Sequence, residues 1–315
     1  MAEGDVGEGR TPVSEGEPGA YADALADRFE EQRRHLEHVA YAVTGSRAAA
    51  EDCVQESWLR LQRVDPGGIR DLRAWLTTTV GHLALDQLGS AQARREHYVG
   101  TWLPEPVVEP LVPGVATAAA DPADRITLDE SLSVALLVVL ERLSPAQRVA
   151  YLLHDVFGMP FDEVAEVVGR SPSAVRQLAS RARKDVRDHQ PRARASVPEQ
   201  REVVDAFVAA CSGGDLGALV SVLDPAVVLR SDGGGKVSAL RGVQRGADQV
   251  ARVLLGFLRK PPLEMRPVLV NGSYGVLARD WAGVLSVVSF VVSDGHVVAI
   301  DIVRNPDKLA GLDEA

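Results

Sequence analysis

The residues best suited to chemistry with another molecule are polar side chains at helical spacing between positions 171 and 187. The apolar residues of this segment fall on one side of the expected helix and predict a buried inner face. Arginine and glutamine can each make two hydrogen bonds to a base edge, and other basic residues contact phosphates. We therefore predict DNA binding here; an ordinary helical hairpin with a solvated basic face is the alternative. The predicted contacts are Ser171, Ser173, Arg176, Gln177, Ser180, Arg181, Arg183 and Lys184.

Three helices are needed to position these side chains. Ser144-Pro145-Ala146-Gln147 has the form of a capping box with proline at the first helical position. A second, shorter amphipathic helix begins at Phe161 and is expected to end at Gly169, since glycine accepts a left-handed backbone. Ser171-Pro172 then begins the basic helix. This short helix, turn and basic helix predict a helix-turn-helix.

Net charge indicates that DNA binding needs a partner. The 315-residue chain has a formal net charge of −10, with 46% hydrophobic and 25% charged residues. Seven Lys/Arg and two Asp lie in 171–194, while 1–18 holds five acidic residues and one arginine. An acidic protein with one confined basic patch is expected to bind free DNA weakly and to depend on a partner for affinity.

The chain also lacks the patterns of exported and membrane proteins. No stretch has the length of a membrane span, and the N-terminus lacks a basic-then-apolar signal peptide. Cys53 and Cys211 have no cysteine or histidine at metal-ligand spacing. We expect a cytoplasmic protein whose two cysteines are reduced core residues, with a redox switch as the alternative.

Composition and periodicity divide the chain into five parts. These are a disordered tail at 1–20, a helical domain at 21–98, a proline-rich linker at 99–122, the helix-turn-helix domain at 123–190 and a third domain at 199–309. The third domain starts with helices and continues with strand-like runs that turn at Asn271-Gly272 and Asp294-Gly295. Two further β-rich runs, at 226–232 and 236–242, flank Gly233-Gly234-Gly235. The expected fold is two all-α domains plus an α+β domain, a cone with a curved antiparallel sheet.

Two segments in the first half are candidates for docking. Asp52, Gln55, Glu56 and Leu59 form a polar-acidic group with one leucine, outside the apolar face of their helix. Pattern alone favours a solvated face over a docking surface for a basic helix. The Trp102-Leu103 pair opens the proline-rich linker and needs shelter from water, which predicts that the linker docks on another part of the chain.

Taken together, the chain resembles bacterial extracytoplasmic-function RNA polymerase sigma factors, in the subgroup with a C-terminal SnoaL-like domain. The resemblance covers about residues 21 to 309 and includes DxxQExxL at 52–59, WLPEP at 102–106, DGGGK at 232–236 and NPDKL at 305–309. It implies core RNA polymerase (β′ and β subunits) and promoter DNA as partners. The 52–59 pattern would then bind the β′ coiled coil, which reverses the solvated-face interpretation.

The resemblance also assigns the two DNA readers. The basic helix would read the minus-thirty-five element, and the helix around 75–95 would recognise the minus-ten element. GSAQARRE at 89–96 has fewer arginines than the family often shows, so upstream DNA contacts there are expected to be weaker. Trp75 could stack near the minus-ten site, although tryptophan at such a position more often belongs to the core. The implied minus-ten residues are Trp75, Asp86, Gln87, Arg94 and Arg95.

For the C-terminal domain, the resemblance implies docking on the sigma part and control of activity in cis. The three subgroup motifs are expected to lie close together; a glycine hairpin turn without a regulatory contact is the alternative. The implied regulatory contacts are Trp102, Leu103, Pro104, Asp232, Gly233, Gly234, Gly235, Lys236, Asn305, Pro306, Asp307, Lys308 and Leu309.

Other functions remain as alternatives. Asp232, Asp280, His296 and Asp301 are the titratable candidates for cyclase-like chemistry, but no paired nucleophile and base is evident. We therefore expect no enzyme activity, no catalytic residue, no cofactor and no metal. A small molecule could bind in the cone of the C-terminal domain. A helix-turn-helix transcriptional regulator with a ligand-sensing domain is the alternative function, and it would leave the 52–59 surface without a role.

Overall fold

The computed structural model describes residues 18–65, 68–95, 98–111, 132–189, 195–257 and 264–312, with the backbone alone at 18–22 and 91–95. Most of the predicted tail, and much of the second half of the linker, lie outside these ranges. No helix in the described ranges is long and apolar enough to cross a membrane.

The first helical unit contains α1 (Pro18–Thr44), α2 (Arg47–Leu61) and α3 (Leu72–Arg95). The α1 helix begins three residues before the position expected from the sequence. The Ser46 hydroxyl accepts from the Ala49 backbone N–H and caps α2. Buried apolar residues such as Phe29, Leu36 and Leu76 line the faces along which the three helices meet.

The second helical unit contains α5 (Val134–Leu140), α6 (Pro145–Tyr151), the π-helical turn η2 (Leu152–Val156), α7 (Phe161–Val168) and α8 (Pro172–His189). The capping box between Ser144 and Gln147 is confirmed. Gly169 ends α7 with φ +65°, also as predicted. One continuous apolar cluster includes buried residues of both helical units, so the two units pack on each other.

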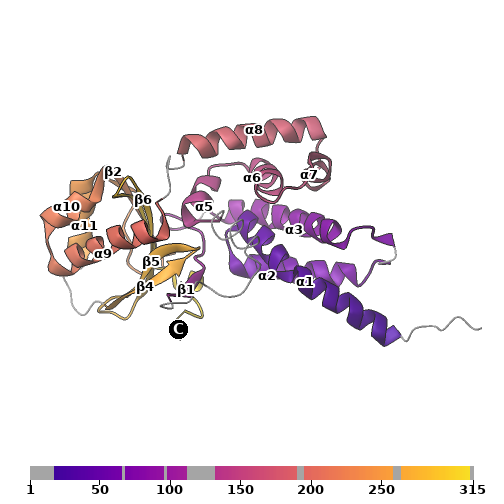
Figure 1. The fold of residues 1–315 in the computed structure, drawn as a ribbon, viewed down its shortest axis with the longest axis horizontal. Coiled ribbons are helices and arrows are strands. Elements are labelled where there is room, and N and C mark those ends of the chain that lie inside the picture. The colour runs from indigo at the N-terminus through magenta and orange to yellow at the C-terminus, as the bar shows by residue number, and fades with distance from the viewer. Residues whose placement is uncertain are drawn as a thin grey trace, which may run out of the picture.

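The C-terminal unit is a curved sheet with helices on one face (Figure 1). Its helices are α9 (Val197–Gly213), α10 (Leu216–Val222) and α11 (Ala247–Phe257), followed by the 3-10 turn η3 (Pro306–Lys308). Its strands are β2 (Leu223–Asp232), β3 (Gln244–Arg245), β4 (Glu264–Val270), β5 (Ser273–Arg279), β6 (Leu285–Ser293) and β7 (His296–Val303). With the linker strand β1 (Val108–Pro110) at one edge, the strand order is β1-β4-β5-β6-β7-β2-β3. The predicted α+β cone is confirmed, with the parallel β2–β7 pair as its one exception to antiparallel pairing.

Both predicted hairpin turns are present. Asn271 and Gly272 have φ of +48° and +71°, and Asp294 and Gly295 have +49° and +72°. Positive φ at both central residues is the requirement of the tight turn that joins twisted antiparallel strands. These turns fix the β4–β5 and β6–β7 registers.

The prediction of a β-rich run at 236–242 was wrong. The backbone N–H groups of Lys236 and Val237 both donate to the Gly233 carbonyl, which closes a tight turn instead of opening a hairpin. Leu240 then packs against the core of the cone, in a stretch that has no strand structure. The strand that follows is the two-residue β3.

The linker contributes β1 (Val108–Pro110), which pairs with β4 at an edge of the sheet. Pro110 is consistent with this place because proline has no N–H for a central ladder. A separate apolar cluster joins Leu103 of the linker, Val134 of α5, Leu309 at the chain end and one face of the sheet. The linker and the second helical unit therefore share a core with the C-terminal unit.

Candidate nucleic-acid interface

The basic helix α8 presents its polar side chains to solvent. Val175, Ala179, Ala182 and Val186 are buried, and the Ser171 hydroxyl accepts from the Ala174 N–H at 3.3 Å at the start of the helix. In Figure 1, α8 runs along the outside of the molecule above α6 and α7. Every residue predicted to contact DNA is exposed, namely Ser171, Ser173, Arg176, Gln177, Ser180, Arg181, Arg183 and Lys184.

Two of these arginines are held by neighbours in their own unit. Arg183 Nε donates to Asp155 at 2.7 Å, and the Arg176 guanidinium lies 5.3 Å from the centre of the Phe161 ring. These contacts hold Arg176 against the start of α7 and Arg183 against η2. The arrangement suits a helix whose polar face enters a groove of DNA while its inner face stays packed.

The acidic group on α2 is also open to solvent. Asp52, Gln55 and Leu59 are exposed and Glu56 is half-buried. Leu59 keeps 44% of its surface exposed, and Glu56 pairs with Arg60 at 3.1 Å. An exposed leucine among acids is suited to an apolar contact surrounded by a basic partner surface.

The predicted minus-ten residues lie along α3. Asp86 is exposed and Gln87 is half-buried. Trp75 is half-buried and packs against the helical core, in line with the more common role of tryptophan. Arg94 and Arg95 belong to the helix, but their side chains lie outside the described part of the structure.

Asp232, at the end of β2, is the centre of an interdomain cluster. It is fully buried, and its carboxylate accepts from the Tyr98 hydroxyl at 2.5 Å, the Leu103 backbone N–H at 2.9 Å and Lys308 Nζ at 2.7 Å. Asn305 Nδ2 donates to the Tyr98 hydroxyl at 2.9 Å. We name Tyr98, Leu103, Asp232, Asn305 and Lys308 the Asp232 cluster. Its members are Tyr98 just before the linker, Leu103 of the linker, Asp232 of β2, and Asn305 and Lys308 after β7.

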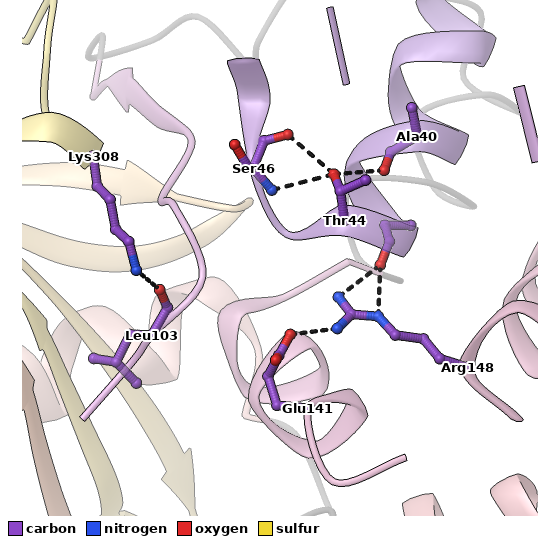
Figure 2. Close-up of polar contacts among 8 residues, drawn as sticks. Ala40, Thr44, Ser46, Leu103, Glu141, Arg148 and Lys308 are labelled. Carbon is purple, nitrogen blue, oxygen red and sulfur yellow. Dashed lines mark hydrogen bonds and ion pairs between the residues drawn. The ribbon is translucent and has the colours of Figure 1, made fainter. Parts of the chain in front are cut away.

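The three sequence motifs therefore meet in the structure. Lys308 Nζ also donates to the Leu103 carbonyl (Figure 2) and lies 4.1 Å from the centre of the Trp102 ring. Lys236 pairs with Asp307 at 2.6 Å. A Cβ at Gly234, where φ is +61°, would lie 2.5 Å from Asn305 Cγ. The glycine is thus required both by its backbone and by close packing.

Comparison with known proteins shows the family to which the chain belongs. Residues 28–94 match the family model for sigma-70 region 2, and residues 133–186 match that for sigma-70 region 4. The chain is 46% identical over 297 residues to the ECF RNA polymerase sigma factor SigJ of Mycobacterium tuberculosis, covering 90% of this chain and 92% of that protein. It is 35% identical to the probable ECF sigma factor SigI of the same species, covering 91% and 95%. This chain belongs to the ECF sigma factors.

The structural comparison agrees with that membership. The crystal structure of M. tuberculosis SigJ matches with a TM-score of 0.72 and 42% identity, covering 91% of this chain and 98% of that one. The sigma factor thus has helical region 2 and region 4 units and a C-terminal α+β unit, and it directs transcription initiation by binding core RNA polymerase and promoter DNA. Membership of this family makes it a transcription factor and not an enzyme.

Regions 2 and 4 of this sigma factor are packed together. A Cβ at Gly81 of α3 would lie 3.2 Å from both Leu153 and Val167 of region 4, so a larger residue would require these side chains to shift. His82 Nε2 lies 3.0 Å from the Glu166 carbonyl of α7. Helix α3 and the first helix of the helix-turn-helix, α7, are therefore in direct contact.

A buried arginine forms a second link between the two regions. Arg148 of α6 is 1% exposed, pairs with Glu141 and donates to the Ala42 carbonyl of α1 at 3.0 Å. Figure 2 shows its guanidinium between Glu141 and the end of α1. Glu141 balances the buried charge of Arg148. Separation of the two regions would remove the hydrogen bond from Arg148 to the Ala42 carbonyl.

The C-terminal unit contacts both regions through one side chain. Asn271 Nδ2 donates to the Tyr41 hydroxyl of α1 at 2.9 Å and to the Leu132 carbonyl, just before region 4, at 3.1 Å. Its Oδ1 accepts from the Val107 N–H of the linker at 3.0 Å. The Tyr41 hydroxyl in turn donates to the Glu105 carbonyl at 2.6 Å. Burial raises the pKa of Tyr41, which keeps it a donor.

Sequence reasoning missed several of these residues. No local sequence motif pointed to the interdomain roles of these residues, which are Tyr41, Tyr98, Arg148 and Asn271. Each of them bonds to a residue that is far away along the chain. For Asn271 the turn was predicted but the interdomain role was not. Tyr98 directly precedes the linker, and its aromatic character beside the WLPEP motif was the available signal. Burial, followed by its bond to Asp232, raises the pKa of Tyr98, so it stays a phenol.

The four titratable candidates for enzyme chemistry are spread over the cone. Asp232 belongs to the interdomain cluster and Asp301 pairs with Arg230 at 2.5 Å. Asp280 pairs with Arg304, and His296 is exposed. The described residues contain no group of three His, Cys, Asp or Glu that could hold a metal ion.

Proposed function

We propose that the C-terminal unit of this sigma factor holds regions 2 and 4 in their compact arrangement and thereby limits transcription until it is displaced. The observation that carries the proposal is the buried Asp232 carboxylate, which accepts from the Leu103 N–H of the linker and from the Tyr98 hydroxyl just before the linker. Together with the Asn271 contacts, it links the C-terminal unit to the two DNA-reading units.

The promoter geometry explains why the compact arrangement limits activity. The minus-ten and minus-thirty-five elements are named for their positions on the promoter, which are about 25 base pairs apart. This separation corresponds to about 85 Å along B-form DNA, at about 3.4 Å per base pair. In the compact form α3 and α7 are joined by the His82–Glu166 contact. Regions 2 and 4 must therefore separate before both can engage one promoter.

The predicted polymerase surface on α2 and the polar face of α8 are open to solvent in the compact form. We propose that Asp52, Gln55, Glu56 and Leu59 bind the β′ subunit of core polymerase and that region 4 also contacts the β subunit. We assign the minus-thirty-five element to the exposed face of α8 and the minus-ten element to α3 with Trp75, Asp86, Gln87, Arg94 and Arg95. Two weak DNA sites then gain affinity when polymerase holds them at fixed spacing.

The energy of the Asp232 cluster is large enough to control this equilibrium. Asp232 is fully buried, and its carboxylate accepts two hydrogen bonds from outside the C-terminal unit, from the Tyr98 hydroxyl and the Leu103 N–H. A hydrogen bond to a charged group contributes about 1.5–3 kcal/mol. Binding to core polymerase must offset the loss of these two bonds to release the C-terminal unit from the linker.

Reconstituted transcription with core polymerase tests the proposal. Asp232→Asn removes the charge and places an amide where Lys308 and the Leu103 N–H donate, so transcript from a cognate promoter should increase several-fold over the unmodified protein. Asp224→Asn is the matched control on the same strand, because its carboxylate accepts from the nearby Ala226 N–H. Equal or lower transcript from Asp232→Asn than from the control contradicts the proposal.

We also propose that the cone of the C-terminal unit receives a small molecule. The support is a cavity of about 110 Å³ between the helices and the sheet, lined by Phe207, Met265 and Ile300 among others. A ligand in this place would act on the same unit that holds the sigma regions together.

A further inference from the structure

The cavity of the cone has the size and lining of a site for a small apolar molecule. Its volume is about 110 Å³, and its wall includes Phe207 of α9, Leu254 of α11 and Val288 of β6. An apolar cavity of about 150 Å³ in another protein stays dry and binds benzene. A single ring or a short chain is therefore the expected size of the ligand.

One charged pair interrupts the apolar wall. Arg304 and Asp280 both line the cavity and pair with each other. Arg304 is 5% exposed, and its Nη1 donates to the Ser238 carbonyl at 2.8 Å. Its Nε–H is buried and has no hydrogen-bond partner in the part of the chain that the structure describes. A buried donor of this kind costs free energy until an acceptor reaches it.

The charge balance selects the class of ligand. Asp280 already neutralises Arg304, so an anionic ligand would place a second negative charge beside Asp280 without a further cation. A pure hydrocarbon would fill the cavity but leave the Nε–H unpaired. We propose that the cavity binds an uncharged, mainly apolar carbonyl compound whose oxygen accepts from Arg304 Nε.

The neighbouring thiol does not compete with this mode of binding. Cys211 lines the cavity, and burial raises its pKa to about 12. It is a protonated thiol at neutral pH and a poor nucleophile toward a carbonyl. Binding is therefore reversible and leaves the ligand unchanged.

The cavity is joined directly to the Asp232 cluster. Successive side chains of a strand point to opposite faces. In β2, Ser231 therefore lines the cavity while Asp232 belongs to the cluster. Just beyond β7, Arg304 lines the cavity and its neighbour Asn305 belongs to the cluster. The backbone N–H groups of Arg304 and Asn305 both donate to the Asp232 carbonyl, at 2.7 and 3.0 Å. Resting on the proposed function, this connection makes the ligand an effector of the interdomain contact.

Binding is tested on the full-length protein with three probes of similar shape. Acetophenone has a neutral carbonyl, ethylbenzene has no acceptor and benzoate is an anion. Methyl chemical shifts of the protein, followed by NMR titration, give each dissociation constant. Acetophenone should bind about 3- to 10-fold more tightly than either other probe, which corresponds to one net hydrogen bond.

Two variants locate the binding site. Arg304→Lys keeps a cation beside Asp280 but removes the Nε–H, so the preference for acetophenone over ethylbenzene should disappear. Ala278→Leu adds volume inside the cavity, where Ala278 forms part of the wall, and should weaken both neutral probes at least tenfold. Equal affinity of the three probes, or acetophenone binding unchanged by both variants, overturns the proposal.

Coupling is tested separately from binding. In reconstituted transcription, acetophenone should change transcript at least twofold with the unmodified protein and have no effect with Ala278→Leu. Specific binding by NMR without this change overturns the coupling alone. The Asp232→Asn experiment uses no ligand, so failure of the proposed function and failure of the ligand site are distinguishable.

Discussion

The side-chain amide of Asn271, in the turn between β4 and β5, donates to the Tyr41 hydroxyl of α1 at 2.9 Å. The two residues are 230 positions apart in the sequence. The same amide reaches the Leu132 carbonyl ahead of region 4. One turn residue therefore contacts both halves of the sigma part, and its positive φ favours asparagine or glycine at this position.

Asn271→Gly should destabilise the folded protein by about 2–4 kcal/mol, since three buried hydrogen bonds of about 1 kcal/mol each are lost. Glycine keeps the positive φ available, so backbone strain does not contribute. Asp294→Gly is the matched control, because it makes the same replacement in the other hairpin turn at φ +49°. Denaturant unfolding measures the change in the free energy of unfolding for each variant. An equal change in the two variants would show that Asn271 stabilises the protein only through its turn conformation.

Local patterns in the sequence were sufficient to predict much of the fold. The capping box at Ser144 and the left-handed Gly169 depend on neighbours within a few residues. The two hairpin turns and the four strands around them depend on short periodic runs in the same way. The exposed face of α8 followed from its inner apolar residues, because a helix buries one face at period 3.6.

Contacts between distant segments could not be predicted in this way. The parallel β2–β7 pair joins strands that are separated by most of the C-terminal unit. The run at 236–242 resembled a strand, but a turn at Gly233 redirects the chain and Leu240 packs against the core of the cone. Arg148 is a typical surface residue by composition, and only the packing of α6 on α1 shows that it is buried.

The polymerase surface can be tested with one exposed leucine. Leu59→Asp should weaken binding to core polymerase at least tenfold, about 1.4 kcal/mol or more, through loss of an apolar contact and the cost of removing a carboxylate from water at that point of the interface. Val64→Asp is the control, since Val64 is similarly exposed at 39% against 44% for Leu59. Fluorescence anisotropy of labelled sigma factor gives both affinities, and a matching loss in Val64→Asp would remove the special role of Leu59.

Base reading and phosphate binding on α8 should separate by salt dependence. Gln177→Ala is expected to relax specificity at one base pair, at a cost of about 1–3 kcal/mol on the preferred sequence. Lys184→Ala should weaken all sequences alike and reduce the slope of log K against log salt by about 1. Holoenzyme binding to promoter variants over a range of salt provides both readouts. Identical sequence profiles for the two variants would contradict this division of roles.

The buried cysteines predict a loss of stability at high pH. Burial raises the pKa of Cys53 to about 11 and of Cys211 to about 12, above the ordinary value of 9.0. The unfolded chain therefore releases these protons at lower pH than the folded chain, and the free energy of unfolding falls as pH rises above 9. Cys211→Ala should show a smaller fall over pH 9–11. The same slope in both proteins would contradict the raised pKa.

The distance between regions 2 and 4 tests the central claim most directly. Nitroxide labels at Ser90→Cys on α3 and Asp162→Cys on α7 occupy exposed positions, while the native cysteines are buried. Pulsed electron resonance should give one short distance in the free protein, a longer population in Asp232→Asn and a still longer distance with core polymerase and promoter DNA. An Asp232→Asn distribution identical to that of Asp224→Asn would contradict control by the Asp232 cluster.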